Sequence, residues 1–134
     1  MKNIQQILDK KGHDVWSIHP DDSVLEAIQM MADKNVGALV VTQDDRLVGL
    51  ITEREYTRNV FLKGKSSPKT KVGDIMLTHV VCARLDQTVE ESMAVMTERH
   101  ARHLPVLHEK KLVGIVSIGD VVKAIIEDKE HDIE

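Results

Sequence analysis

The hydrophobic and polar positions of the chain form one pattern that occurs twice, 65 positions apart and without a gap. Most of the matching positions are hydrophobic residues or glycines. They include Leu39 and Leu104, Val41 and Val106, and the triplets Leu47–Gly49 and Leu112–Gly114. Self-similarity at a fixed spacing predicts two copies of one structural unit. Two copies are too few for a solenoid, so we expect the pair to close on itself as one domain.

Each copy begins with a strand followed by an amphipathic helix. The short apolar run Val15–Ile18 predicts the strand of the first copy. Ser23–Glu26 has the form of a capping box at a helix start, and Thr88–Glu91 repeats it in the second copy. Apolar residues then follow at helical spacing in both copies: Val24, Ala27, Ile28 and Met31, and Val89, Met93 and Met96.

A hairpin and a second helix complete each copy. Paired apolar runs separated by four polar residues predict the hairpins. These runs are Ala38–Thr42 with Leu47–Thr52, and His103–Leu107 with Leu112–Ser117. Second helices are expected at residues 53–62 and 118–128, short leading helices at 4–10 and 72–76, and a polar linker at 63–71. The prediction is therefore an α+β fold, a tandem pair of β-α-β-β-α units.

The composition narrows the function classes. The chain has 134 residues, a net charge of −4 and only three aromatic residues, so its core must consist of aliphatic residues and methionine. The acidic balance argues against a nucleic-acid-binding protein. No apolar run approaches the roughly 18 residues of a membrane span, and the N-terminus lacks the apolar stretch of a signal peptide. The single cysteine, Cys82, cannot form an internal disulfide, and together these features favour the cytoplasm.

Several motifs at the repeat spacing resemble the cystathionine-β-synthase (CBS) domain pair. They are Val72–Met76, His103–Val106, Gly49–Glu55 and Gly114–Asp120. The segment Gly49–Tyr56 resembles the corresponding segment of stand-alone bacterial CBS-pair proteins. The resemblance implies one module over residues 1–134, with repeats at 8–62 and 73–128 related by a pseudo-twofold axis. It also implies two clefts between the repeats, which in this family commonly bind AMP, ADP, ATP, NAD or S-adenosylmethionine.

One candidate nucleotide site centres on Asp120. An ionised carboxylate can accept both hydroxyls of a ribose, and Ser117 stands where a strand meets a helix. By resemblance, this cleft also takes residues from the start of the first copy, and Arg102 and His103 match family positions that reach phosphate. The full set is Lys11, Val15, Trp16, Val36, Arg102, His103, Ile115, Ser117 and Asp120.

The second candidate cleft centres on Glu55, where the family has aspartate. The extra methylene of glutamate can displace the carboxylate from the ribose, so we expect weaker or no occupancy there. The set is Gly37, Ala38, Thr52, Arg54, Glu55, Arg58, Val80 and Val81. Both motifs, Thr52-x-x-Glu55 and Ser117-x-x-Asp120, also match helix capping signatures, which need no ligand. Arg54 and Arg58 lie one helical turn apart and are candidate phosphate ligands, or equally an ordinary solvated helix face.

The residues indicate a regulatory module that binds an adenine nucleotide, with an unknown regulated partner and no required cofactor. The helix around Val121–Ile126 is apolar on more than one face, which predicts a homodimer or a helix buried between the copies. The alternative function is a ligand-free dimeric interaction module. An enzyme is not expected because no acid, base and nucleophile converge, and the histidines lack the spacing of a metal site.

Overall fold

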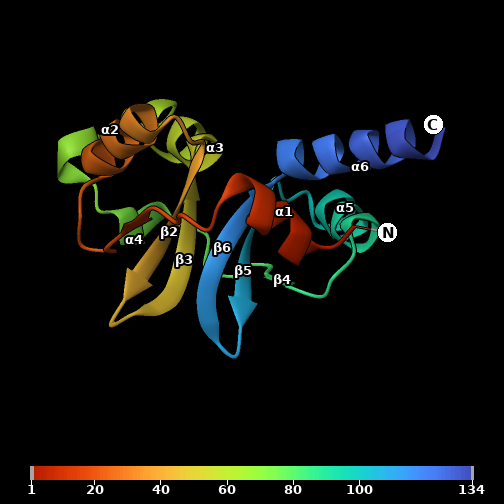
Figure 1. The fold of residues 1–134 in the computed structure, drawn as a ribbon. Helices are drawn as coiled ribbons and strands as arrows, with labels where there is room; N and C mark the ends of the chain where they lie inside the picture. Colours follow the sequence, from red (N-terminus) through yellow and green to blue (C-terminus); the bar gives the residue numbers. More distant parts are fainter. Residues whose placement is uncertain (1, 134) are drawn as a thin grey trace. The chain divides into compact units, whose positions relative to one another are not determined.

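The computed structural model describes residues 2–133, and the side chains of residues 2–129. The chain divides into two compact units, each built around one copy of the repeat (Figure 1). Unit 1 comprises Met1–Val15 with Val81–Glu134, and unit 2 comprises Trp16–Val80. The mixed α+β fold with two similar repeats is as predicted.

The elements follow the predicted order in both copies. Unit 2 contains β1 (Ser17–Ile18), α2 (Val24–Lys34), β2 (Ala38–Gln43), β3 (Arg46–Thr52), α3 (Glu53–Tyr56) and α4 (Val72–Ile75). Unit 1 contains α1 (Ile4–Lys11), β4 (Ala83–Arg84), α5 (Val89–Arg99), β5 (His103–His108), β6 (Lys111–Ser117) and α6 (Ile118–Ile133). In place of the single helix predicted at residues 53–62, α3 is short and continues as a π-helical turn at Thr57–Phe61.

Each unit has a three-stranded sheet, in the order β1-β2-β3 or β4-β5-β6. The first strand pairs in parallel with the second, and the last two form an antiparallel hairpin. The strand predicted at Val15–Ile18 is shorter than expected, since only Ser17 and Ile18 pair with β2. Both hairpins carry a register shift at the same repeat position, after Val41 and after Val106.

The hairpin turns are tighter than the four polar residues predicted. Each has two central residues with positive φ: 53° and 61° at Asp44 and Asp45, and 51° and 67° at Glu109 and Lys110. Positive φ at both positions is the geometry of a type I′ turn, which matches the twist of the strands it joins. Glutamate and lysine are unusual there because their Cβ atoms disfavour the left-handed region.

The helix starts show the predicted caps in part. The Ser23 and Thr88 hydroxyls accept hydrogen bonds from the N–H groups of Glu26 and Glu91. The full reciprocal capping box occurs instead at α1, where Asn3 and Gln6 satisfy each other's backbone N–H groups.

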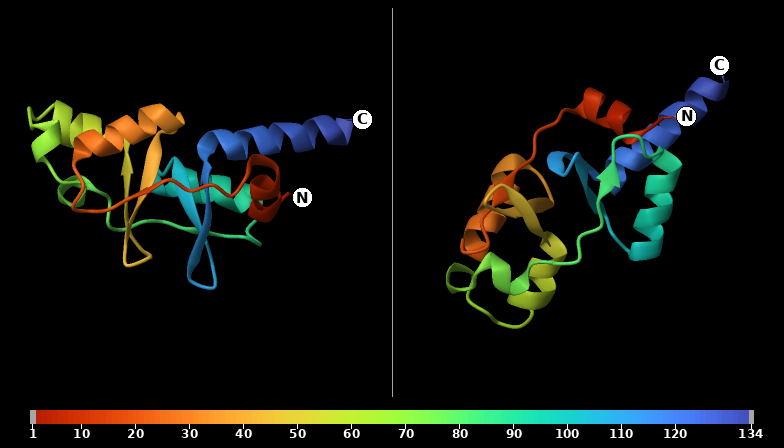
Figure 2. Two further views of the ribbon diagram at one scale, coloured as in Figure 1. Left: turned by 60° about the vertical axis from the view of Figure 1, so that its left-hand side comes forward. Right: turned by 90° about the horizontal axis from the view of Figure 1, so that it is seen from below.

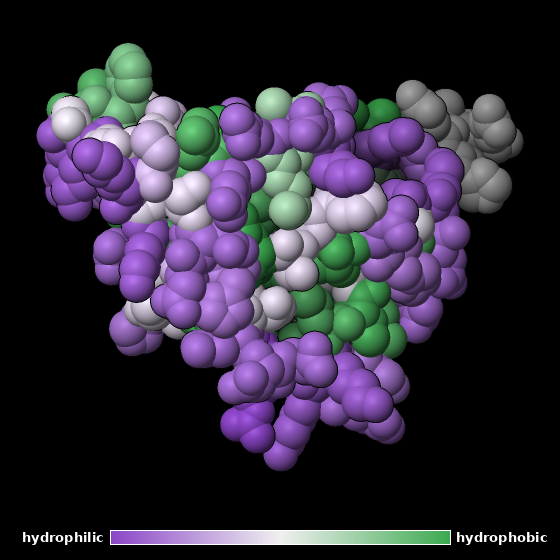
Figure 3. Space-filling view, turned by 90° about the vertical axis from the view of Figure 1, so that its left-hand side faces the viewer, coloured by the Kyte–Doolittle hydropathy of each residue, from purple (hydrophilic) through white to green (hydrophobic). Residues whose placement is uncertain are grey.

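The two cores consist of aliphatic residues, methionine and alanine, as the shortage of aromatic residues requires. Leu39, Val41 and Ile51 are fully buried in unit 2, and Leu104 and Val106 are fully buried in unit 1. Burial of such side chains contributes roughly 1.5–3 kcal/mol each relative to exposure, which makes these clusters the main source of stability. The surface drawn in Figure 3 is largely hydrophilic, with hydrophobic patches.

Each repeat packs against the segment that leads the other repeat. Helix α1 lies beside α6 and completes the second repeat (Figure 2), while α4 completes the first. A Cβ atom on Gly114 would lie 2.7 Å from the Leu8 side chain, and one on Gly49 would lie 2.5 Å from Met76 Sδ. The two glycines of the repeat therefore allow the leading segments to approach the sheets.

None of the helices in the described part of the chain has the length and apolar composition that a membrane crossing needs.

Candidate functional site

Asp120 lies in the first turn of α6, and two groups from distant parts of the sequence bind the same oxygen of its carboxylate. The Ser117 N–H and the Lys11 ammonium each donate to Asp120 Oδ2 over 2.8 Å. Lys11 also donates to the carbonyl oxygen of Ile115, over 2.9 Å. The last turn of α1 therefore brings Lys11 to the end of β6, and four of the predicted residues meet at this point.

Ser117 and Asp120 also form the helix cap that the motif allowed. The Asp120 N–H donates to Ser117 Oγ over 3.2 Å, which completes the reciprocal pattern of a capping box. Capping uses only Oδ2 of the carboxylate. In the described structure no hydrogen bond reaches Asp120 Oδ1, and the side chain is 24% exposed.

The carboxylate of Asp120 is held in its ionised form. Partial burial by itself would raise its pKa. The hydrogen bonds from Lys11 and Ser117, with the positive charge of Lys11, outweigh that effect and hold the pKa below its ordinary value. An ionised carboxylate accepts hydrogen bonds only, as the recognition of hydroxyl donors requires.

Arg102 and His103 lie at the same end of the β5–β6 strand pair as Ser117. His103 is directly across from Ser117 in the register of β5 and β6, and the Arg102 carbonyl accepts a hydrogen bond from Ile118 N–H over 2.8 Å. The Arg102 residue is exposed and His103 is half-buried. Both predicted phosphate residues therefore flank the strand-to-helix junction that carries Ser117.

Three other predicted residues are not placed at this junction by the structure. Val15 is the last residue of its segment in unit 1, whereas Trp16 and Val36 belong to unit 2. The Trp16 ring carries Lys34 Nζ 4.3 Å from its centroid, a cation–π contact. Val36 lines a groove of about 300 Å³ in unit 2 together with Gly37 and Glu53. The role of these three residues in ligand binding stays a prediction.

The Glu55 set repeats the backbone geometry of the Asp120 set. Ala38 pairs with Thr52 in the sheet, and Glu53 N–H donates to the Gly37 carbonyl over 3.1 Å. The contact between the motif residues differs, however. The Thr52 hydroxyl donates to the carboxylate of Glu55, Thr52 makes no side-chain cap, and Glu55 is 7% exposed.

The two sets differ most in charge. Shifting by 65 positions replaces Lys11 by Met76, Arg102 by Gly37 and His103 by Ala38. The cations at these three repeat positions therefore accompany Asp120 and have no counterpart beside Glu55. In the Glu55 set, Arg54 and Arg58 lie on α3 and the π-helical turn, Val80 ends unit 2, and Val81 belongs to unit 1.

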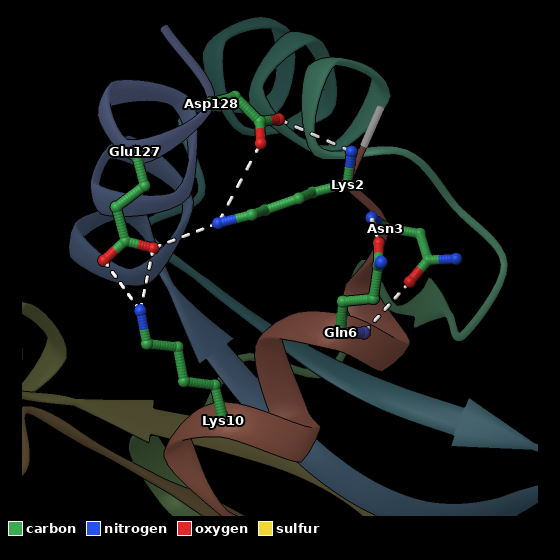
Figure 4. A network of polar contacts seen from close by, with 6 residues as sticks. All are labelled: Lys2, Asn3, Gln6, Lys10, Glu127 and Asp128. Atoms are coloured by element: carbon green, nitrogen blue, oxygen red, sulfur yellow. Dashed lines mark hydrogen bonds and ion pairs between the residues drawn. The ribbon is translucent and has the colours of Figure 1, made fainter. Parts of the chain in front are cut away.

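A second ionic cluster beside Asp120 was not predicted from the sequence. Lys2 and Lys10 both donate to the Glu127 carboxylate on α6, over 3.0 Å and 2.9 Å, and hold its pKa at about 2 (Figure 4). Lys2 also lies 3.9 Å from Asp128. Lys2, Lys10 and Glu127 line a groove of about 270 Å³ between α1 and α6, which Lys11 and Asp120 also line. Partners about 120 positions apart leave no local sequence signal.

The remaining candidate chemistry is sparse. Half-burial raises the pKa of the Cys82 thiol, which keeps it in the unreactive protonated form. Among the described residues, no group of three or more His, Cys, Asp or Glu side chains is arranged to hold a metal ion.

Comparison with known proteins matches both repeats of the chain to one protein family. The profile of the CBS domain matches residues 6–61 and 72–127. A mitochondrial CBS domain-containing protein of Arabidopsis thaliana is 40% identical over 119 residues, which are 85% of this chain and 58% of that protein. The chain thus spans just over half the length of this relative.

Solved structures agree with the fold. A putative signal-transduction protein with CBS domains from Burkholderia ambifaria is 43% identical, with a TM-score of 0.92 over 95% of this chain and 96% of that one. A CBS domain pair in complex with 5-methylthioadenosine and S-adenosyl-L-methionine has a TM-score of 0.84 at 22% identity, over 96% of this chain and 98% of that one.

Proposed function

This chain belongs to the CBS-domain family, as a pair of CBS repeats that forms a regulatory or signalling module, and on that basis we propose that it binds an adenine nucleotide at Asp120. The observation that carries the proposal is the state of the Asp120 carboxylate. It is ionised and partly exposed, and its Oδ1 accepts no hydrogen bond in the described structure. Such an oxygen is suited to accept a ribose hydroxyl.

The surrounding residues supply the donors that a nucleotide needs. Lys11 and Arg102 provide positive charge, and His103 and the Ser117 hydroxyl provide further donors. The related fold that was solved with two adenosine compounds supports this ligand class. The proposed ligands are AMP, ADP, ATP or NAD, bound as one molecule per chain.

The Glu55 set is proposed to bind more weakly or not at all. Its carboxylate is buried and accepts the Thr52 hydroxyl, and the matching positions lack Lys11, Arg102 and His103. A buried carboxylate that already has a donor must lose that donor before it can accept a ribose hydroxyl.

The proposed module acts without catalysis. Binding regulates an unidentified partner by changing the population of conformations that differ in ligand affinity. The proposed setting is the cytoplasm, supported by the single cysteine. A nucleotide hydrolysis assay tests the absence of catalysis, and sustained turnover by the purified chain would contradict it.

Calorimetric titration tests the ligand and the site together. We expect one AMP, ADP, ATP or NAD molecule per chain, and loss of that site in Asp120→Ala. Glu55→Ala is the matched control at the equivalent position and is expected to bind as the wild type does. Because Asp120→Ala also removes a cap and an ion pair, thermal unfolding of each variant must show that it is folded at the titration temperature. Equal binding by folded Asp120→Ala and the wild type would refute the assignment.

A second candidate function rests on the outer face of α6. Ile118, Val122 and Ile126 are 38%, 40% and 51% exposed and follow one another at a spacing of four residues. They form an apolar stripe suited to a homodimer, which needs no ligand. A thermal-shift screen with AMP, ATP, NAD and S-adenosylmethionine separates the two functions, because a ligand-free interaction module gains no stability from any of them.

A further inference from the structure

Two adjacent hydrophobic residues in unit 2 protrude into solvent at the end of the π-helical turn. Phe61 and Leu62 are 68% and 70% exposed, the highest values among the exposed large hydrophobic residues described. We call them the Phe61–Leu62 tip. The Leu62 N–H donates to the Thr57 carbonyl and the Lys65 N–H to the Val60 carbonyl, so the backbone of the tip is ordered by hydrogen bonds.

The tip is exposed because Val60, the residue before it, occupies the position that faces the core of unit 2. Val60 is fully buried in the core of unit 2, and the two residues that follow it turn away from that core. Gly64, at φ +65°, then ends the helical segment. The two side chains of the tip are therefore not part of the core, and packing within unit 2 does not explain why they are large and apolar.

A run of lysines follows the tip. Between Glu55 and Asp74 the chain has no acidic residue, although its net charge is −4. Four exposed lysines lie in this interval: Lys63, Lys65, Lys69 and Lys71. Only Lys71 has an acidic neighbour, Asp21 at 3.8 Å, among the ion pairs of the described residues. We call these four residues the lysine segment.

We propose that the Phe61–Leu62 tip and the lysine segment form a site that binds the surface of an anionic lipid bilayer. A protruding apolar pair can enter the region between headgroups and acyl chains, while lysines beside it contact negative headgroups and bury their stems along the same surface. The tip protrudes into solvent, and the four lysines are spread over turns and the short 3-10 helix Ser67–Lys69. A bilayer fits this arrangement because it requires neither a pocket nor a fixed pattern of charges.

The charge distribution favours a bilayer of acidic lipids in particular. The stretch between Glu55 and Asp74 carries only positive charges in a chain of net charge −4, so the attraction is local and screened by salt. Figure 3, which views the molecule from the side of this segment, shows hydrophobic groups that protrude beside hydrophilic ones. Association of this kind is peripheral, and it does not depend on the proposed nucleotide site.

The test is co-sedimentation of the full chain with vesicles of phosphatidylcholine, with or without phosphatidylserine, at low and at physiological salt. Binding is expected only with phosphatidylserine and is expected to weaken with salt. At about 1 kcal/mol per basic residue, which is about fivefold, reversal of two charges in Lys63→Glu/Lys65→Glu should weaken binding about 25-fold or more. Phe61→Ser/Leu62→Ser should weaken it about tenfold or more.

Two matched controls separate the site from general effects. Lys110→Glu/Lys111→Glu changes the net charge equally at an exposed hairpin in unit 1, and Leu77→Ser removes a 44% exposed leucine elsewhere in unit 2. Both controls should bind vesicles as the wild type does. All variants should unfold near the wild-type temperature and retain nucleotide binding in calorimetry, so that failure of the two proposals can be distinguished.

Four results would overturn the lipid site. The first is that the wild type does not bind phosphatidylserine vesicles. The second is that Lys110→Glu/Lys111→Glu weakens vesicle binding as much as Lys63→Glu/Lys65→Glu does. The third is tight binding of soluble polyglutamate that the Phe61→Ser/Leu62→Ser variant retains, which would assign the segment to an acidic protein. A lower mass of that variant in light scattering with unchanged vesicle binding would assign the tip to contact between two copies of this chain.

Discussion

Lys11 Nζ lies 2.8 Å from Asp120 Oδ2, so a lysine from the N-terminal helix occupies one oxygen of the candidate ribose-binding carboxylate and leaves the other oxygen open. The pair joins positions 109 residues apart within unit 1. Because Lys11 also donates to the Ile115 carbonyl, its ammonium is fixed at the end of β6. A ligand phosphate near Asp120 would find this cation already in position.

Arg102 should distinguish nucleotides from nucleosides. A charge-assisted hydrogen bond contributes roughly 1.5–3 kcal/mol, so Arg102→Ala should weaken AMP binding by roughly ten- to a hundredfold. Adenosine should bind both proteins almost equally because it has no phosphate. The measurement is calorimetry of both ligands with both proteins at one salt concentration. Equal losses for AMP and adenosine would indicate a misfolded site, and no loss for either would contradict the phosphate role.

The apolar stripe on α6 should hold a homodimer together. Val122→Glu/Ile126→Glu places two charges in the stripe and should convert a dimer at tens of micromolar into a monomer, as measured by light scattering. Leu77→Glu, at an exposed leucine of unit 2, is the control and should remain dimeric. A wild-type chain of monomer mass at that concentration would contradict the prediction.

Substitution in the hairpin turn at Glu109 and Lys110 should stabilise the folded protein. Both residues have positive φ, and asparagine followed by glycine adopts a type I′ turn with less strain. Glu109→Asn/Lys110→Gly should raise the free energy of unfolding by about 1 kcal/mol and the unfolding temperature by a few degrees.

The other hairpin provides the internal control. Asp44 and Asp45 adopt the same geometry, but aspartate tolerates the left-handed region better than glutamate or lysine. Asp44→Asn/Asp45→Gly should therefore stabilise the protein less. A larger gain at the aspartate turn would show that backbone strain is not the dominant effect.

The stabilisation by Glu127 should disappear in acid. Lys10 and Lys2 lower the pKa of Glu127 from 4.5 to about 2, so the ionised form is favoured in the folded chain. A depressed folded pKa gives stability that is fully present above 4.5 and is lost as the pH falls towards 2. The difference in free energy of unfolding between the wild type and Glu127→Gln should shrink over that range in urea titrations.

A surface ion pair serves as the comparison. Asp86 lies 3.2 Å from Arg84 but is 84% exposed, so Asp86→Asn should change the unfolding free energy little at any pH. If the difference in free energy of unfolding between the wild type and Glu127→Gln stays constant as the pH falls from neutral towards 2, ionisation of Glu127 does not contribute to stability.

Local features were predictable because they depend on neighbouring residues. Short-range patterns predicted the Ser23 and Thr88 caps, both hairpins and the aliphatic core. The repeat showed that these elements belong to two copies of one unit. The junction of Ser117, Asp120 and His103 follows from a strand pairing that the hairpin pattern already implied. The approach of Lys11 to Asp120 came from the family resemblance rather than from spacing.

Other features depend on contacts that no short-range pattern records. The Glu127 cluster joins α1 to α6 across nearly the whole chain. The π-helical turn at Thr57–Phe61 was missed because its residues are compatible with an ordinary helix. The different state of Glu55 could be anticipated only in part: the sequence showed its extra methylene, and the structure adds its burial and the Thr52 hydroxyl.

The placement of the two leading segments also determines when each half of the protein can fold during synthesis. Ile4 and Leu8 leave the ribosome before the other members of their core, which include Val116 and Val121. They must stay unburied until Val116 and Val121 have been made. The first repeat, by contrast, is complete once Val72 and Ile75 have emerged. Unit 2 should therefore fold on the nascent chain well before unit 1, and division of the chain into two fragments at the linker should leave each repeat without one of its helices.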